Sequence, residues 1–517
     1  MKKRPNIIVF MTDQQNGDTV LDRSQAITPN LDAFKQSAVQ FTQAYCASPH
    51  CCPSRASFFS GLYPSQHGVW NNVEVDNAIS RGLYDGVKLF PESLKEQGYH
   101  TVFSGKWHVS AYEGPKDRGF DEVLYEYISN YGRFQPCNRP RNKDWEKVYH
   151  SPEKMAFSGT KRGFGELVRE GYPVYRQFDV SETDQFGDKI TVERACEVLY
   201  ARKPGDEPLF LFAGPTGPHD PYYPPQEYLD LYRGKEINLP ENFDDTMEDK
   251  PALYRRTKER FSLSREEHVE CIRHYLAMVS YEDFLFGKVL EAVKKSGEWE
   301  NTFIFYLTDH GDYMGAHGLW SKGLPCFREA YHICALAGGG KIDAPKQVDE
   351  LVSITDFAPT ILELAGVHAD SALSGRSLVD FLRGRMPVNW RRELFVQTNG
   401  NELYGIQRAV WDRKWKYVFN GFDYDELYDL EEDPGELHNR IDCAENREVV
   451  KAMCRKIWEF ARKTGDNCTC EYIMVSLAPY GPGILLENTD GSGKETLADQ
   501  RVKVVRAAGT CSEKRRE

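Results

Sequence analysis

The sequence predicts an α/β protein in which a large, mostly parallel or mixed sheet is sandwiched by helices, followed by a smaller α+β subdomain with an antiparallel sheet. Short apolar runs rich in β-branched and aromatic residues alternate with longer helical patterns, which is typical of βα units around a parallel sheet. An amphipathic stretch over residues 266–295 has the length of a helix that covers such a sheet. After residue 382 the pattern changes to strand-like runs followed by one helix.

The strands of the large sheet are expected at four apolar runs, residues 7–11, 101–103, 209–213 and 303–307. Thr28 offers an N-cap hydroxyl and Pro29 suits the first helical position, so a helix is expected to begin there. The C-terminal part has predicted strands at residues 394–397 and 416–419 and a predicted helix at residues 447–463. We therefore predict a catalytic domain over residues 1–382 and an α+β subdomain over residues 383–517.

Composition and charge exclude several classes of function. The chain of 517 residues is 40% hydrophobic, which is enough to bury a large core. Its formal net charge of −13 excludes a general nucleic-acid or anionic-membrane surface, because both need a basic face. No stretch approaches the roughly twenty apolar residues of a membrane span. An anionic substrate would therefore have to be held by local cations.

The expected compartment is the cytoplasm, unless a leader has been trimmed. The run at residues 7–11 is too short for the core of a signal peptide and ends in polar residues, so it is interpreted as a strand. The 13 cysteines are odd in number and lack the regular spacing of a disulfide framework. That usage fits a reducing environment.

Polar residues follow each of the four predicted strands of the large sheet. Asp13 follows the first, residues 105–108 the second, residues 218–220 the third and residues 309–310 the fourth. In open α/β sheets, ligands bind beyond the carboxyl ends of the strands. We therefore expect these four segments to converge on one site.

A second feature is the segment SPHCCPSRASFFSG at residues 48–61. Pro53 suits the first turn of a helix, which places Cys51 at the helix N-terminus, where free N–H groups and the helix dipole favour a negative charge. Arg55 lies four residues on and can return to the same end of the helix. Two adjacent cysteines before a helix are also consistent with ordinary core residues or a thiol nucleophile. The rest of the motif favours a special role for Cys51.

This segment resembles the sulfatase signature C-x-P-S-R, followed by a helix and Ser/Thr-Gly, within the alkaline phosphatase superfamily. The resemblance implies an alkaline phosphatase-like fold. It also implies that Cys51, and not Cys52, is oxidised to formylglycine by a separate formylglycine-generating enzyme. Arg55 would then steady the alkoxide that forms on this residue.

The resemblance extends to a metal site. Asp13 and Asp309 are placed to supply two carboxylates to a hard cation. Residues 12–14 resemble the first metal segment of the family, which often carries two aspartates, and residues 308–311 resemble the second. The implied ligands of one divalent cation are Asp13, Gln14, Asp309, His310 and the modified Cys51. Gln14 is a departure, because an amide oxygen brings one charge less, and Gln14 could instead orient Asp13. Ca²⁺ is the expected ion, and His310 makes Mn²⁺ the second candidate.

Further segments resemble the sulfate-handling residues of the family. Lys106 and Lys322 match the sulfate-binding lysines, and His219 matches the histidine that protonates the leaving alcohol. In the family scheme the hydrated formylglycine, deprotonated with help from Asp309 and the metal, attacks sulfur and leaves a covalent sulfate on the enzyme. His108 then removes the proton of the second hydroxyl, and the aldehyde reforms as sulfate departs. The implied catalytic residues are Cys51, Arg55, His108, His219 and Asp309.

The resulting hypothesis is an enzyme, a sulfuric ester hydrolase that releases inorganic sulfate and an alcohol from a small-molecule ester. A sulfated sugar is favoured because long segments wall the pocket. Asn71, Asn72 and Glu74 follow the nucleophile helix and are candidates to reach sugar hydroxyls, although such residues are also typical of a turn. Two alternatives stay open: a phosphonate or phosphate ester hydrolase of the same superfamily, and a non-catalytic binding protein on the same fold.

Overall fold

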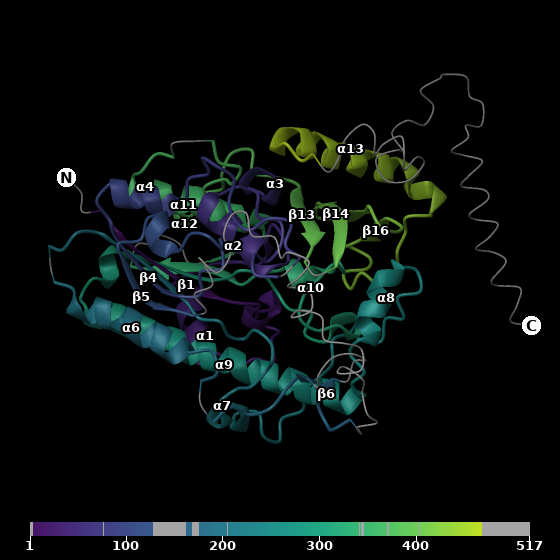
Figure 1. Cartoon of the computed structure of the whole chain (residues 1–517), viewed down its shortest axis with the longest axis horizontal. Helices are drawn as coiled ribbons and strands as arrows, with labels where there is room; N and C mark the ends of the chain where they lie inside the picture. Colours follow the sequence, from purple (N-terminus) through teal and green to yellow (C-terminus); the bar gives the residue numbers. More distant parts are fainter. Residues whose placement is uncertain are drawn as a thin grey trace, which may run out of the picture.

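The computed structural model has three layers, with one large sheet between two sets of helices (Figure 1). It describes residues 4–75, 77–127, 162–167, 175–182, 184–203, 205–340, 342, 346–369, 372–401 and 403–467. The eight strands of the sheet are β1 (Asn6–Thr12), β2 (Val39–Phe41), β4 (His100–Gly105), β5 (Glu122–Glu126), β8 (Leu209–Gly214), β9 (Thr302–Thr308), β10 (Ala335–Gly339) and β11 (Lys346–Val348). Their order is β11-β2-β10-β9-β1-β8-β4-β5.

The sheet is mixed, with a parallel centre. β9, β1, β8, β4 and β5 pair in parallel, whereas β10 runs antiparallel to both β9 and β2. The four strands predicted from the apolar runs are β1, β4, β8 and β9, which are neighbours at the centre of the sheet. The prediction of a mostly parallel or mixed sheet is confirmed, and the parallel centre brings the carboxyl ends of these strands to one edge.

Both faces of the sheet are buried. In β1, Ile7, Val9 and Met11 pack into one hydrophobic cluster, while Ile8 and Phe10 pack into the other. Because successive side chains of a strand point to opposite faces, a strand covered on both sides reads as an unbroken apolar run. This explains why residues 7–11 show no alternation of polar and apolar residues.

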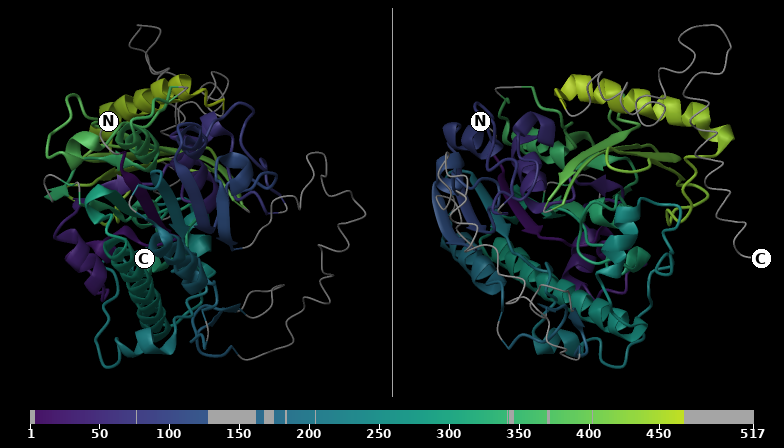
Figure 2. Two further views of the ribbon diagram at one scale, coloured as in Figure 1. Left: turned by 90° about the vertical axis from the view of Figure 1, so that its left-hand side faces the viewer. Right: turned by 45° about the vertical axis from the view of Figure 1, so that its right-hand side comes forward.

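Helices cover the two faces (Figures 1 and 2). One face carries α1 (Pro29–Lys35), α6 (Asp188–Ala201), α7 (Gln226–Asp230) and the long α9 (Arg265–Lys295). The other carries α2 (Cys51–Ser60), α3 (Pro64–His67), α4 (Phe90–Glu96), α11 (Phe357–Ala365) and α12 (Val379–Leu382). A capping box begins α9: the Ser264 hydroxyl accepts from the Glu267 N–H, and the Glu267 carboxylate accepts from the Ser264 N–H. The helix predicted over residues 266–295 is therefore present.

A four-stranded antiparallel sheet forms the C-terminal part, with α13 (Arg447–Thr464) packed against it (Figure 2). Its strands are β13 (Leu394–Gly400), β14 (Tyr404–Trp411), β15 (Trp415–Asn420) and β16 (Glu426–Asp429). The α+β subdomain is thus present, while the boundary between residues 382 and 383 stays a prediction. The remaining short elements are β3 (Ala44–Tyr45), β6 (Glu166–Leu167), β7 (Tyr175–Arg176), α8 (Ala252–Glu259), α10 (Arg328–Tyr331) and β12 (Val352–Ser353).

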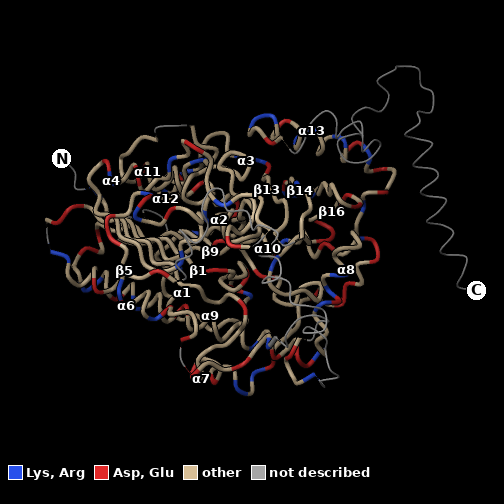
Figure 3. The backbone as a smooth tube through the Cα atoms, in the orientation of Figure 1, with Lys and Arg blue, Asp and Glu red and all other residues tan. Residues whose placement is uncertain are grey.

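Charged residues of both signs are interspersed along the outer helices, and the strands of the large sheet are almost free of them (Figure 3). Among the helices that the structure describes, none combines the length and apolar composition that a membrane span requires. None of the nine cysteines in the described part of the chain is joined to another of them by a disulfide bond.

Two buried carboxyl groups face each other between α6 and α9. Asp188 accepts hydrogen bonds from the N–H groups of Thr216 and Gly217 at 2.5 and 2.9 Å, and Glu282 contacts Asp188. Neither oxygen of the buried Glu282 carboxyl has a hydrogen-bond partner among the described residues, so its charged form is poorly stabilised beside Asp188 and the protonated form is favoured. Burial, reinforced by Asp184, raises the pKa of Asp188 to about 7, and burial beside Asp188 raises the pKa of Glu282 well above its ordinary value.

This pair predicts a specific pH dependence of stability. The folded state holds protons that the unfolded chain releases near the ordinary pKa values of 3.8 and 4.5, so the free energy of unfolding falls as pH rises through this range and up to the raised values. The variant Glu282→Gln removes the part of this penalty that comes from Glu282. In urea unfolding it should gain stability relative to wild type between about pH 5 and about pH 8. Glu291→Gln, on the exposed side of the same helix beside Lys295, is the control and should show no such gain. A difference in the free energy of unfolding between Glu282→Gln and wild type that is the same at about pH 5 and at about pH 8 would refute the raised pKa of Glu282.

Candidate active site

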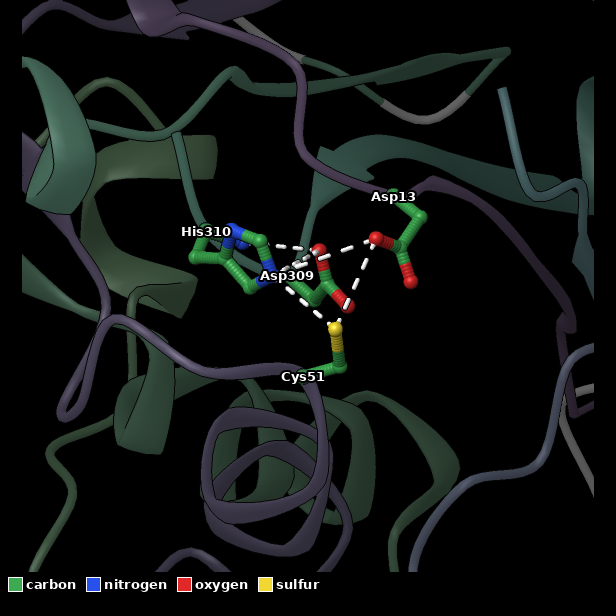
Figure 4. A group of neighbouring side chains, drawn as sticks. All are labelled: Asp13, Cys51, Asp309 and His310. Carbon is green, nitrogen blue, oxygen red and sulfur yellow. Dashed lines mark hydrogen bonds and ion pairs between the residues drawn. The ribbon is translucent and has the colours of Figure 1, made fainter. Parts of the chain in front are cut away.

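Three segments meet at the carboxyl edge of the sheet, as the sequence predicts (Figure 4). Asp13 follows β1, Asp309 and His310 follow β9, and Cys51 begins α2. All four side chains are buried, and one ligand atom of each lies within 4.8 Å of the others. The chain thus gathers two carboxylates, an imidazole and a thiol at one point.

Cys51 is the first residue of α2, and Pro53 lies in the first turn. Its Sγ atom is 3.2 Å from His310 Nε2 and 3.7 Å from Asp13 Oδ1. Burial raises the pKa of the thiol, but the nearby charges of Lys106, Lys322 and His310 outweigh burial and hold the pKa well below its usual range. The surroundings of position 51 therefore favour a negative charge on whatever group stands there.

Arg55 is fully buried and links the two carboxylates. Its guanidinium donates from Nε to Asp309 Oδ2 at 2.8 Å, from Nη2 to Asp13 Oδ2 at 3.1 Å and from Nη1 to the Lys106 carbonyl at 2.7 Å. Burial and Cys51 raise the pKa of Asp13, but Lys106, His219 and Arg55 outweigh them and lower it. Arg55 thus fixes the two strand ends relative to each other and to α2.

Two lysines border position 51. Lys106 Nζ is 2.7 Å from Asp13 Oδ2, and Lys322 Nζ is 2.8 Å from His219 Nε2. His219 Nδ1 lies 2.7 Å from the Asp220 carbonyl, which only accepts, so the proton of the neutral ring is on Nδ1 and Nε2 accepts from Lys322. All three side chains named from the sequence therefore lie around the same point.

Gln14 lies beside the site with a left-handed backbone, φ 63°. Its amide nitrogen donates to Asp312 Oδ2 at 2.6 Å and to Asp220 Oδ1 at 3.1 Å, and its amide oxygen accepts from Lys322. These contacts engage both the nitrogen and the oxygen of the Gln14 side-chain amide. The role of Gln14 as a metal ligand stays a prediction.

Asp312 was missed by sequence reasoning. It is fully buried, accepts from the Tyr222 hydroxyl as well as from Gln14, and burial raises its pKa to about 6. The sequence did offer a signal for this residue, because Asp312 comes three residues after Asp309, just past the end of β9. It supports the side chain of Gln14 rather than facing Cys51.

His108 lies near Cys51 and pairs with Glu74. The His108 Nε2 atom is 2.7 Å from Glu74 Oε2, and Cys52 Sγ donates to the same carboxylate at 3.7 Å. Burial lowers the pKa of His108 and Glu74 raises it. A Cys52 thiolate would raise it further, but burial raises the pKa of the Cys52 thiol to about 12, so this thiol is uncharged at neutral pH and leaves His108 able to act as a base. Asn72, another candidate for sugar contact, accepts from the Cys52 N–H at 3.1 Å.

The four clustered side chains fit a divalent cation. Asp13 and Asp309 are both completely buried, and burial together with Asp13 raises the pKa of Asp309. Two carboxylates crowded in a buried site repel each other, which a bound cation offsets. Carboxylate oxygens suit a hard cation such as Ca²⁺, and the imidazole of His310 also suits Mn²⁺.

Comparisons with known proteins agree with this geometry. Residues 5–367 match the sequence profile of the sulfatase family, and residues 315–463 match the N-sulphoglucosamine sulphohydrolase C-terminal family. A sulfatase of Escherichia coli K12 is 28% identical over 473 residues, covering 90% of this chain and 88% of its own. The human N-acetylglucosamine-6-sulfatase is 26% identical over 526 residues, covering 94% and 90%.

Among solved structures, the phosphonate monoester hydrolase of Agrobacterium radiobacter superposes with a TM-score of 0.71 at 22% identity, covering 89% of this chain and 96% of its own. This likeness concerns the fold alone. The sulfatase profile spans more than half of the sequence, including every segment that reaches the carboxyl edge of the sheet. The chain therefore belongs to the sulfatase family, within the alkaline phosphatase superfamily.

Proposed function

We propose that this protein hydrolyses a sulfate ester of a carbohydrate and releases inorganic sulfate and an alcohol. The observation that carries the proposal is the position of Cys51 at the start of a helix, with Sγ within 3.7 Å of Asp13 and His310. Maturation requires a formylglycine-generating enzyme as partner. The hydrated aldehyde supplies an oxygen nucleophile and a second hydroxyl through which sulfate can later be expelled.

The cations of the site suit the sulfuryl group. Charge develops on its oxygens in the transition state, and Lys106 and Lys322, whose charges both act on position 51, are proposed to meet it. His219 Nε2 lies 2.8 Å from Lys322 Nζ beside position 51, and His219 is proposed to protonate the departing alcohol from Nε2 when the ring carries protons on both nitrogens. Arg55 acts by holding Asp13 and Asp309 in place.

One divalent cation is proposed at Asp13, Asp309, His310 and residue 51, with Gln14 as a further candidate. When bound, it supplies positive charge that favours an ionised hydroxyl at position 51. Ca²⁺ is the proposed ion, and Mn²⁺ is the second candidate.

Metal binding can be measured independently of turnover. Ca²⁺ at about 100 times its Kd should add about 2.7 kcal/mol to the free energy of unfolding of the wild type. Asp13→Ala should abolish this gain and leave less than about a tenth of the bound metal in elemental analysis. Asp18→Ala is the control, since Asp18 pairs with Arg328 away from the cluster and should keep the metal. Equal metal content in Asp13→Ala and wild type would show that the ion binds elsewhere.

A carbohydrate ester is proposed because the human relative is named for a sulfated amino sugar. The test is a panel of sulfated mono- and disaccharides, including N-acetylglucosamine 6-sulfate, assayed with protein whose residue 51 is converted. We expect at least one sugar to be hydrolysed faster than an aryl sulfate. Aryl sulfate turnover without turnover of any sulfated sugar would move the proposal to small aryl esters.

The alternative within the superfamily is a phosphonate or phosphate ester hydrolase. The segment resembles that of sulfatases in keeping Lys106 and His108, which phosphonate hydrolases of the superfamily typically replace, and this favours the sulfate ester. Matched sulfate and phosphonate esters of one alcohol separate the two, with a higher kcat/KM expected for the sulfate. A higher kcat/KM for the phosphonate would overturn the proposal, and loss of both activities in fully converted protein would favour a binding protein.

A further inference from the structure

A carboxylate outside the predicted catalytic set lies against His108. Glu74 Oε2 is 2.7 Å from His108 Nε2, with 18% of the Glu74 side chain and 19% of the His108 side chain exposed. Sequence reasoning considered Glu74 only as a contact for sugar hydroxyls. Its carboxylate is instead turned toward an imidazole that borders position 51.

The loop that carries Glu74 is hydrogen-bonded to Cys52 in the first turn of α2. Asn72 accepts a hydrogen bond from the Cys52 N–H at 3.1 Å, and the Val73 N–H lies 3.4 Å from Cys52 Sγ. In the turn after β13, the side chain of Asn401 accepts from the Asn72 N–H at 2.9 Å. Glu74 is therefore held at a fixed distance from the residue next to Cys51.

The pairing determines which nitrogen of His108 can accept a proton. A carboxylate only accepts hydrogen bonds, so the ring proton of neutral His108 is on Nε2, and Nδ1 has a lone pair. His108 Nδ1 is buried and makes no well-formed hydrogen bond to a described residue, although the ring lies close enough to the Cys51 side chain to interact with it. A buried polar atom without a partner is costly, which indicates a partner that arrives during the reaction.

We infer that Glu74 is a positioning residue that holds His108 with Nδ1 free to take a proton from the sulfated side chain at position 51. This inference rests on the proposed function. In the release step the O–H bond of the remaining hydroxyl breaks, and the proton passes to His108 Nδ1. The freed electron pair forms the C=O bond, and the C–O bond to sulfate breaks with its electrons on the departing sulfate. Glu74 stabilises the imidazolium that results, as a carboxylate does in a catalytic triad.

The test uses protein with residue 51 converted and 4-nitrophenyl sulfate as probe. Nitrophenolate leaves without a proton, so the first half of the reaction does not depend on His219. Glu74→Gln should keep a rapid burst of nitrophenolate but slow sulfate release by about 10²-fold. Sulfated residue 51 should then accumulate and be detected by mass spectrometry after acid quench. Glu74→Asp, which restores the carboxylate, should recover part of the release rate.

Two further variants separate positioning from general disturbance. Glu122→Gln breaks a similar pair, in which Glu122 Oε1 lies 2.9 Å from His100 Nε2 at the sheet edge, and should leave burst and release unchanged. The double variant of Glu74→Gln with His108→Ala should release sulfate no more slowly than His108→Ala alone, because Glu74 acts through His108. In a crystal structure of Glu74→Ala that retains the Cys51 thiol, the His108 ring should leave its position.

The outcomes of these experiments distinguish failure of the proposed role of Glu74 from failure of the proposed function. Sulfate release at the wild-type rate in Glu74→Gln, or slow turnover without accumulation of the sulfated residue, overturns the inference and leaves the proposed function intact. An unmoved His108 ring in Glu74→Ala also overturns it. If converted wild-type protein releases no sulfate from any ester, the proposed function fails instead.

Discussion

The variant Cys51→Ala is expected to reduce turnover of sulfate esters by about 10⁵-fold or more, because removing a nucleophile leaves only binding and charge stabilisation. The buried cluster around position 51 should persist, since the alanine still begins α2 and Arg55 still bridges Asp13 and Asp309. Steady-state kinetics and urea unfolding of the same preparation measure the two effects separately.

Cys454→Ala is the matched control, because Cys454 is a buried thiol in α13, within the core of the C-terminal sheet. It should lose some stability but keep kcat/KM per folded molecule. A Cys51→Ala protein that retains more than about a hundredth of wild-type activity would rule out a nucleophile at this position.

The second large effect is expected for Arg55→Met. The variant leaves two completely buried carboxylates without their cation, which should lower the free energy of unfolding by about 3 to 5 kcal/mol. Turnover of the remaining folded protein should fall by about 10²- to 10³-fold, because Asp13, Asp309 and Lys106 lose their common anchor. Urea unfolding at neutral pH and kinetics per folded molecule give both quantities.

Arg202→Met provides the comparison for this prediction. Arg202 forms a buried ion pair with Glu298 near the start of β1, at the opposite end of the strand from the active site. It should lose stability in the same range but keep its kcat. If the two variants lost activity equally, the loss in Arg55→Met would reflect general instability and not a role at the site.

The centre of the fold was predictable because buried parallel strands leave unbroken apolar runs. β1, β4, β8 and β9 each follow that rule, and the capping residue Ser264 marks the start of α9. The edge of the sheet was not predictable in the same way. β2 and β11 have three residues each, and β10 ends in two glycines, so their pairing is decided by neighbours far away in sequence.

The site was predictable to the extent that its residues follow strand ends or begin a helix. Asp13, Cys51 and Asp309 meet because the parallel centre places those points at one edge. The pairing of Glu74 with His108 joins residues from two loops whose approach depends on α2 and the C-terminal sheet. No local pattern encodes such a contact, and the same holds for Asp188 and Glu282.

The most direct test of the account is the covalent state of residue 51. Mass spectrometry of the peptide that contains this residue, from protein that hydrolyses a sulfated sugar, should find formylglycine in a fraction that rises in proportion to specific activity across preparations. Full activity in a preparation that carries only the intact Cys51 thiol would contradict it.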